Sequence, residues 1–270
     1  MKACLAHWDE IAERLRHFTG AFLALDFDGV LAPIAARPEL AQMPTENRAL
    51  LEQLAKTPGL CVAVVSGRSL ADVRQRVHLD SLLYAGNHGA EIMMNGVSEN
   101  HIRLIDYRSA LTDVFAELST WRLRFPGLWI EDKGFGIGVH YREVPTEKLP
   151  PLIAEFAEWT KKLPEELKIV KAKMMYEVRS QEEWNKGSAV LRIWEAVAPA
   201  SLPFCLGDDH TDEDGFIALS GKGVNIFVGN TKDSHAEYFL ESTDDVTRFL
   251  QRLLQEAQSR FGAAPQTPGV

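Results

Sequence analysis

The feature that most constrains the fold is an apolar run that begins at Ala21 and ends in two aspartates, Asp26 and Asp28. A short continuous apolar run that ends at a turn residue, here Gly29, is typical of a strand buried on both faces of a parallel sheet. Ligands of open α/β sheets bind just beyond the carboxyl ends of the strands, so the sequence places both carboxylates at an expected functional site. Because neighbouring carboxylates repel each other, the pair needs a cation or a shared proton, although a simple capping role is the alternative.

Strands and helices alternate around this run, which is the pattern of parallel βαβ units. We expect Thr45 to cap the first helix after it, and Ser69 with Asp72 to form a capping box on the second. The pattern predicts strands over 21–26, 60–65, 82–85, 203–206 and 224–229, the last being the final core strand, a hairpin over 91–105, and helices over 5–17, 45–56 and 244–258. Residues 262–270 are expected to be disordered.

The middle of the chain has a different pattern, which predicts an inserted α+β unit over 106–185 in a parallel-sheet domain formed by 1–105 and 186–270. Residues 135–142 alternate between apolar and polar side chains, as one strand does. Residues 170–178 alternate in the same way, so they predict one strand with Val170 and Ala172 on the apolar face.

The composition limits which molecules the protein can bind and where it can act. The formal net charge of -9 argues against nucleic-acid and anionic-membrane partners, which select basic surfaces. Three widely separated cysteines indicate neither a disulfide framework nor a zinc site. The amino terminus lacks the apolar segment of a signal peptide, and no stretch is apolar enough for a membrane span. We therefore expect a cytoplasmic monomer that acts on a small molecule.

Polar side chains recur where the predicted parallel strands end. Ser66 follows the second strand, Asp208 follows a later one, and Lys186 lies in the first turn of a helix. A lysine there opposes the helix dipole, so either a bound anion offsets it or it is simply solvated. Carboxylates from two strands suit Mg²⁺, while a hydroxyl and an ammonium suit phosphate oxygens. This set predicts phosphoryl transfer, with Asp26 as nucleophile and Asp28 as general acid and base.

The motifs resemble those of a known family. Asp-Phe-Asp-Gly-Val-Leu, Ser66, Lys186 and the acidic run that begins at Gly207 are similar to the four motifs of the haloacid dehalogenase superfamily. Gly-Asn-His-Gly-Ala-Glu (86–91), Glu-Asp-Lys-Gly-Phe-Gly-Ile-Gly-Val-His-Tyr-Arg (131–142) and Glu-Val-Arg (177–179) resemble the trehalose-6-phosphate phosphatases within it. The likeness covers residues from about 20 to 250 and implies a doubly wound, Rossmann-like core with an inserted cap.

This resemblance also implies roles for individual residues. Asp26 is expected to form an aspartyl phosphate, Ser66 and Lys186 to hold phosphoryl oxygens, and the inserted unit to close over the sugar. The implied Mg²⁺ ligands are Asp26, Asp28 and Asp208, with Asp209 or Asp212 completing the set. The implied substrate-binding residues are Arg68, Asn87, His88, Glu131, Lys133, Arg142, Glu177 and Arg179.

Two other functions remain open from the sequence. Another capped sugar-phosphate phosphatase, acting on sucrose phosphate or mannosylglycerate phosphate, differs only in the residues of the inserted unit. A catalytically silent regulatory module is a different class, which the intact Asp26, Asp28 and Lys186 argue against. For the charged residues of the inserted unit, a solvated surface with no binding role is the alternative.

Overall fold

A computed structural model describes residues 1–100, 104–132, 136–172, 174–181, 184–230 and 233–261. The chain forms two compact units, each described here by itself. Unit 1 consists of Met1–Glu99 and Trp184–Val270, and unit 2 of Asn100–Glu183. The first division falls before helix α4 (Leu104–Thr120), which packs on strands of unit 2, whereas the sequence places it at 105/106.

Unit 1 is built on a nine-stranded sheet with the order β1-β13-β12-β11-β2-β3-β4-β5-β6. The strands from β1 to β4 in this order run parallel, and β5 pairs antiparallel with β4. This arrangement confirms the predicted doubly wound α/β core. The strands are β1 (Lys2–Ala3), β2 (Ala21–Leu25), β3 (Leu60–Val65), β4 (Leu83–Gly86), β5 (Glu91–Met94), β6 (Val97–Asn100), β11 (Leu202–Gly207), β12 (Val224–Val228) and β13 (Tyr238–Leu240).

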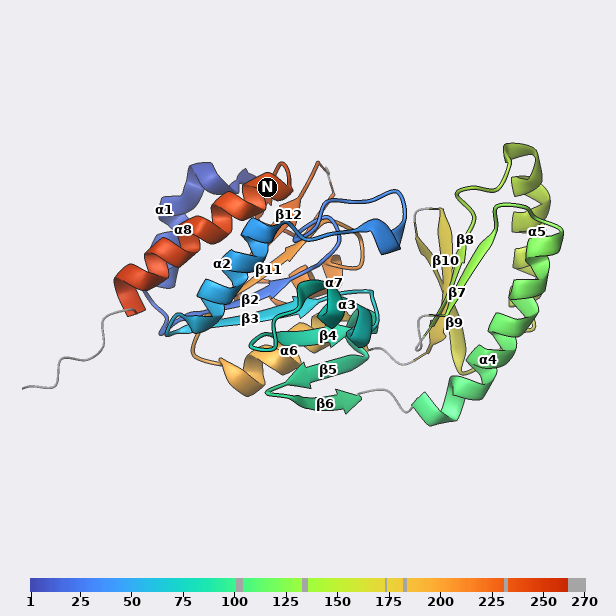
Figure 1. Cartoon of the computed structure of the whole chain (residues 1–270), viewed down its shortest axis with the longest axis horizontal. Helices are drawn as coiled ribbons and strands as arrows, with labels where there is room; N and C mark the ends of the chain where they lie inside the picture. The colour runs from blue at the N-terminus through green and yellow to red at the C-terminus, as the bar shows by residue number, and fades with distance from the viewer. Residues whose placement is uncertain (101–103, 133–135, 173, 182–183, 231–232, 262–270) are drawn as a thin grey trace, which may run out of the picture. The chain divides into compact units, whose positions relative to one another are not determined.

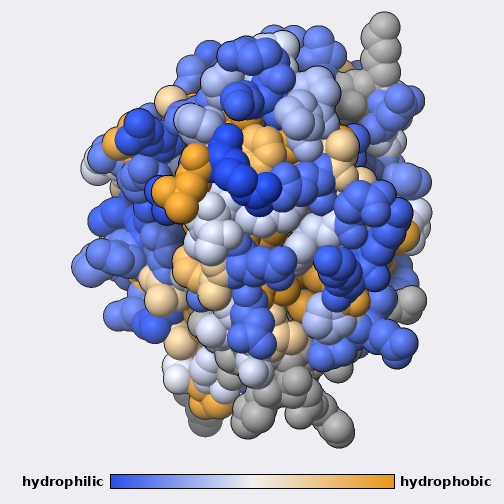
Figure 2. Space-filling view, turned by 90° about the vertical axis from the view of Figure 1, so that its right-hand side faces the viewer, coloured by the Kyte–Doolittle hydropathy of each residue, from blue (hydrophilic) through white to orange (hydrophobic). Residues whose placement is uncertain are grey.

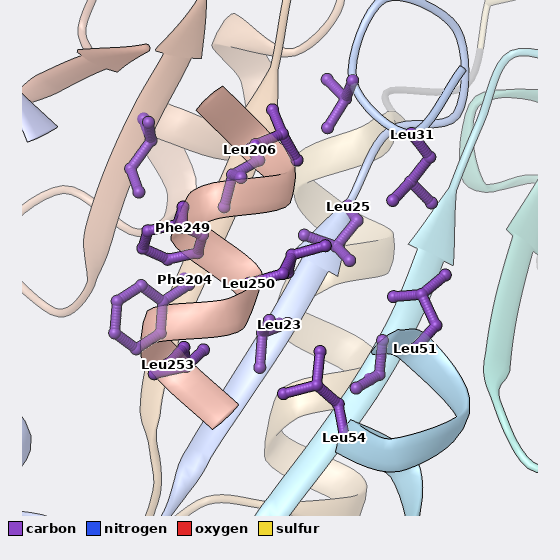
Figure 3. Packing of buried hydrophobic residues seen from close by; sticks show 14 of the residues in the cluster. Leu23, Leu25, Leu31, Leu51, Leu54, Phe204, Leu206, Phe249, Leu250 and Leu253 are labelled. Carbon is purple, nitrogen blue, oxygen red and sulfur yellow. The ribbon is translucent and has the colours of Figure 1, made fainter. Parts of the chain in front are cut away.

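Helices cover both faces of this sheet (Figure 1). All five residues of β2 are buried, because Leu23 and Leu25 pack toward α2 and α8 while Phe22 and Ala24 pack toward α6 and α7. Figure 3 shows the first of these two layers, where Leu250 of α8 lies beside the β2 leucines and Leu51 of α2 lies over β3. The α-helices are α1 (Trp8–Leu15), α2 (Thr45–Lys56), α3 (Leu70–Val77), α6 (Lys186–Val197), α7 (Glu213–Ala218) and α8 (Thr243–Phe261), and 3₁₀ turns cover η1 (Cys4–His7), η2 (Pro38–Leu40) and η3 (Asn87–Gly89).

Two expectations for unit 1 are wrong. Thr45 is the first residue of α2 rather than its cap, because Pro44 takes the N-cap position and makes no side-chain bond there. The sheet also continues beyond β12 to β13, a three-residue strand too short to give a periodic signal. The Ser69 cap is confirmed, since its Oγ accepts a hydrogen bond from the Asp72 amide at 3.2 Å.

Unit 2 is a four-stranded antiparallel sheet, ordered β7-β8-β10-β9, with helices on one face (Figure 1). Apolar side chains of the strands and of α4 and α5 form its buried layer, including Ile137, Val139, Leu118 and Phe156. The outer surface at the end shown in Figure 2 mixes hydrophilic residues with hydrophobic groups. The remaining elements are η4 (Trp121–Leu123), β7 (Trp129–Asp132), β8 (Gly136–His140), η5 (Thr146–Lys148), α5 (Leu149–Thr160), β9 (Leu167–Ala172) and β10 (Met175–Ser180).

The predicted single strand over 170–178 is wrong, because the chain turns there and forms the hairpin β9–β10. Met174 adopts φ 59° in this turn. Directly opposed residues share a face, and Val170 opposes Glu177 while Ile169 opposes Val178. Val170 and Ala172 therefore lie on the face opposite to the one expected, since a turn inside an alternating run reverses which residues face the core.

Lys133, which was expected to bind substrate, and the tail 262–270, which was expected to be disordered, lie outside the described residues. Across the part of the chain that is described, none of the helices combines the length and the apolar character needed to cross a bilayer.

We expect Leu51→Ala to destabilise unit 1 by about 2–5 kcal/mol, because it removes a fully buried side chain and leaves a cavity. Leu40→Ala is the matched control, since Leu40 is 60% exposed and its loss should change the free energy of unfolding by less than about 0.5 kcal/mol. Urea unfolding followed by circular dichroism measures both. Equal losses would show that the layer packed under α2 and α8 does not carry the stability of unit 1.

Candidate active site

The site lies at the carboxyl end of the central strand of unit 1. β2 pairs with β11 on one side and β3 on the other, so the strand order reverses here, which is where open α/β sheets bind ligands. Asp26 follows β2, Asp208 follows β11 and Ser66 follows β3. All three strands are parallel, so the three side chains share one edge of the sheet, as the sequence predicts.

Lys186 is buried between two carboxylates. Its Nζ donates to Asp212 Oδ1 at 2.7 Å and to Asp26 Oδ1 at 3.1 Å, and only 4% of the residue is exposed. Asn185 starts the helix that carries it, because its Oδ1 accepts the Ser188 amide at 2.9 Å. Burial alone lowers the pKa of an ammonium, but Asp212 and Asp26 raise the pKa of Lys186 well above its usual value. Lys186 is therefore a permanent cation here, partnered by carboxylates rather than solvated.

Asp26, Asp208 and Asp212 form a tight acidic group, with one oxygen from each lying within 4.8 Å of the others. Lys186 supplies a single positive charge, so the group retains excess negative charge. Burial raises the pKa of Asp26 well above its usual value despite the opposing effect of Lys186. Burial, with the neighbouring Asp212 and Asp209 carboxylates, raises the pKa of Asp208 to about 7. The described side chains thus leave this group short of positive charge.

The carboxylates of Asp209 and Asp212 differ in their surroundings. Asp212 joins the acidic group and, through Oδ2, also accepts the amides of Asp208 at 3.0 Å and Asp209 at 3.2 Å. Asp209 is outside that group, and its Oδ1 accepts both the amide and the hydroxyl of Thr211 at 2.7 Å. Of the two candidates that the sequence left open, Asp212 is the one placed beside Asp26.

Two glycines allow the carboxylates to converge. Gly29 has φ 78°, and a Cβ on it would lie 2.0 Å from Asp208 Oδ2. A Cβ on Gly207 would lie 2.2 Å from the Asp212 Cβ. Any side chain at either position would push these carboxylates away.

Asp28 has a partner of its own. Arg68 binds its carboxylate with two donors, Nε to Oδ2 at 2.6 Å and Nη2 to Oδ1 at 2.7 Å. The same guanidinium also binds Asp72 and the Pro38 carbonyl. Such a fork-to-fork pair fixes both position and plane of the Asp28 carboxylate. Arg68, which the resemblance implies as a substrate ligand, is thus a neighbour of the expected acid/base residue.

The Asn87–Gly89 turn supports the loop that carries Ser66. The His88 amide donates to the Ser66 carbonyl at 3.0 Å, and the Asn87 amide to the Arg68 carbonyl at 2.6 Å. Asn87 is buried and donates from Nδ2 to Glu91 Oε2 at 2.7 Å. Both Asn87 and His88 have positive φ, at 49° and 55°, a strained arrangement that is typical of functional sites. In the structure, therefore, these two residues support the Ser66 loop through their backbone amides.

The expected sugar-binding residues of unit 2 lie mostly on the face of its sheet that α4 and α5 do not cover, which we call the open face. Glu131 and Glu177 both oppose Gly138, so they share this face and one row across it, and Glu177 is buried. Arg179 lies one row further along β10. Arg142 is exposed in the turn after β8, rather than on a strand.

Carboxylate oxygens are the hard ligands that Mg²⁺ prefers, and the acidic group offers three of them in reach of one another. The excess negative charge around Asp208 is the electrostatic condition for binding a divalent cation. The donor set therefore fits Mg²⁺. The sequence did not separate Asp209 from Asp212, because both follow Asp208 within four residues and only their contacts differ.

Comparison with known proteins agrees with this geometry. Residues 24–244 match the family model described as trehalose-phosphatase. A probable trehalose-phosphate phosphatase 4 from Oryza sativa subsp. japonica is 33% identical over 265 residues, covering 94% of this chain and 71% of the relative.

Solved structures share the fold. The C-terminal domain of C. albicans trehalose-6-phosphate phosphatase superposes with a TM-score of 0.77 at 21% identity, covering 92% of this chain and 97% of that one. A haloacid dehalogenase-like hydrolase from B. subtilis superposes with a TM-score of 0.59 at 18% identity, covering 86% and 99%. These likenesses confirm the expected haloacid dehalogenase-like core.

The raised pKa of Asp208 predicts how the stability of the metal-free protein depends on pH. The folded chain keeps this proton up to about pH 7, whereas the unfolded chain loses it near 3.8, so the folded state binds more protons between these values. The free energy of unfolding should therefore fall as pH rises across this window. Urea unfolding in the presence of a chelator measures it.

Asp208→Asn should reduce that dependence, because the amide does not titrate, while Asp26, whose pKa is also raised by burial, keeps its own contribution. Asp80→Asn is the control, since the Asp80 side chain is 95% exposed, and it should retain the wild-type slope. A slope that is the same in Asp208→Asn and wild type would mean that Asp208 does not carry the extra proton.

Proposed function

This chain belongs to the trehalose-phosphatase family, and we propose that it hydrolyses trehalose 6-phosphate to trehalose and phosphate with Mg²⁺ through a phosphorylated Asp26. As a member it is a phosphoric monoester hydrolase. The observation that carries the proposed mechanism is the Asp26 carboxylate, held by Lys186 at the switch point of the sheet beside Asp208 and Asp212.

In the first step, Asp26 attacks phosphorus. Lys186 holds Oδ1, which orients the carboxylate, and the other oxygen forms the new bond to phosphorus. The bond from phosphorus to the 6-oxygen of the sugar breaks. Lys186 and Ser66 lie at the same sheet edge, where the ammonium would offset negative charge on the phosphoryl oxygens and the hydroxyl would donate a hydrogen bond to one of them.

Asp28 acts as the general acid in the first step and as the general base in the second. In the first it protonates the departing sugar oxygen, since an alkoxide is a poor leaving group, and in the second it takes a proton from the attacking water. That water attacks phosphorus, and the bond to Asp26 breaks to release phosphate. Arg68 donates one hydrogen bond to each oxygen of Asp28, so the proton that Asp28 transfers would occupy a lone pair that Arg68 leaves free.

Asp26, Asp208 and Asp212 are the side chains that would hold Mg²⁺, together with the Asp28 backbone carbonyl. When bound, the ion supplies the positive charge that the acidic group lacks and neutralises phosphoryl oxygens. Asp26 must be ionised to attack, and added positive charge lowers the pKa that burial raises.

The open face of the sheet of unit 2 is the proposed sugar-binding surface. Glu131 and Glu177 lie in one row there, and carboxylates accept hydrogen bonds from sugar hydroxyls. The identity of the residues on this face is what would separate trehalose 6-phosphate from sucrose phosphate or mannosylglycerate phosphate.

A phosphate-release assay over trehalose, sucrose, glucose and mannosylglycerate phosphates, with and without chelator, tests the substrate. We expect Mg²⁺-dependent release with trehalose 6-phosphate preferred.

Asp26→Asn should reduce turnover by about a thousandfold or more, because the amide is no nucleophile, while Asp80→Asn keeps wild-type turnover. No release from any of the four would favour the silent module, and preference for another sugar phosphate would favour the second candidate.

Binding of Mg²⁺ alone tests the ligand set without turnover. An ion that binds only the folded state raises the melting temperature, with about 2.7 kcal/mol of stabilisation at a concentration 100-fold above its dissociation constant. We expect this rise in wild type and Asp209→Asn, but a much smaller one in Asp212→Asn, because only Asp212 belongs to the acidic group. The reverse ranking would make Asp209 the ligand.

A further inference from the structure

Trp129 presents an indole on the open face of unit 2, the face shared by Glu131 and Glu177. It is the first residue of β7, and 38% of it is exposed. The His140 ring stacks on it, with ring centroids 4.4 Å apart and planes 27° from parallel. One face of the indole is therefore covered by the His140 ring, while more than a third of the Trp129 residue stays exposed. Tryptophan is enriched at binding surfaces, because its large apolar ring also carries an N–H donor.

His140 joins this indole to Glu131. Its Nε2 lies 2.9 Å from Glu131 Oε2, and because an ionised carboxylate can only accept, Nε2 is the donor. The strand register explains the contact, since His140 opposes Trp129 while its neighbour two residues away, Gly138, opposes Glu131. Stacking on one side and hydrogen bonding on the other leave the imidazole little freedom to rotate.

Gly138 provides the room for this contact. A Cβ at Gly138 would lie 2.9 Å from His140 Nε2 and 3.3 Å from Glu131 Oε2. A Cβ at Gly136 would lie 3.3 Å from Glu177 Oε1. The missing side chains on β8 thus let both carboxylates and the imidazole lie across the strand. They occupy two neighbouring rows, one in which Trp129 opposes His140 and one in which Glu131 and Glu177 oppose Gly138.

We propose that Trp129 is a stacking platform for a pyranose ring of the substrate and that His140 is the positioning residue that holds Glu131 beside it. A pyranose has a face of C–H groups and a rim of hydroxyls. The C–H face, which carries slight positive charge, suits the negative face of an indole, and the hydroxyls suit the adjacent carboxylates. The platform rests on the proposed function for its substrate, and it adds two residues to the recognition of the sugar.

Steady-state kinetics with trehalose 6-phosphate and p-nitrophenyl phosphate test the platform. For Trp129→Ala we expect kcat/KM for the sugar phosphate to fall about tenfold more than for the aryl phosphate, a difference of about 1.4 kcal/mol carried by KM. Trp129→Phe should recover most of it. Leu123→Ala, which removes a side chain that is 90% exposed in unit 2, is the control and should match wild type. Equal losses on both substrates would overturn the platform.

A double-mutant cycle tests the positioning role. His140→Phe keeps a ring under Trp129 but removes the donor, and Glu131→Gln removes the charged acceptor. If His140 acts through Glu131, the two effects on KM for the sugar phosphate should not add, and His140→Gln, which keeps an Nε2 donor, should recover part of the loss. Strict additivity without recovery would leave His140 with no positioning role.

Binding of trehalose alone separates this proposal from the proposed function. We expect calorimetry to detect trehalose binding to the wild-type full chain and to Leu123→Ala, and binding at least about tenfold weaker to Trp129→Ala. Trehalose binding that depends on Trp129 in a chain without phosphatase activity would support the platform and reject the reaction. Binding equal in wild type and Trp129→Ala, or absent from wild type, would overturn the platform whatever the activity.

Discussion

The contact between one buried ammonium and two buried carboxylates holds the active site together. Burying Lys186 without partners, or Asp26 and Asp212 without a cation, would cost several kcal/mol. The contact joins the end of β2, the loop after β11 and the start of α6, which are far apart in sequence. These three elements therefore have to meet with their charged groups in register. Because one ammonium cannot balance three carboxylates, the same contact prepares the site for a cation.

Backbone geometry makes this convergence possible. Gly29 and Gly207 each stand where a Cβ would overlap a carboxylate of the site. The sequence pairs both glycines with aspartates, as Asp28-Gly29 and Gly207-Asp208, so the turn residue and the acid are placed together. A strand that ends in an aspartate next to a glycine places a carboxylate at the sheet edge, and the glycine leaves room for a second carboxylate to approach it.

The two units carry different parts of the proposed activity. Unit 1 contains the proposed nucleophile, the proposed acid/base residue and the acidic group, at or just beyond the strand ends. Unit 2 contains a sheet with one packed face and one open face, on which an indole, an imidazole and two carboxylates occupy two neighbouring rows. A reaction site at strand ends and a recognition surface on a second sheet can vary independently, so one core can be combined with different recognition surfaces.

Sequence reasoning succeeded where the signal is local. The run from Ala21 and the run over 60–65 are continuous and apolar, so their positions, and the acid or hydroxyl at each end, follow from the pattern. It failed over 170–178, because alternation continued through the turn at Met174 and reversed the face of Val170. The prediction that Thr45 caps α2 was also wrong, because the residue type alone does not show whether the preceding residue occupies the N-cap position.

The sequence by itself determined the fold class, the family, and which polar residues stand at strand ends, because these depend on short patterns along the chain. Only the tertiary structure decided the partners of those residues. It paired Asp28 with Arg68, chose Asp212 over Asp209 as the neighbour of Asp26, and set Trp129 on His140 beside Glu131. Each of these contacts joins different elements, and the distance between two elements depends on how all of them pack, which no spacing within one segment records.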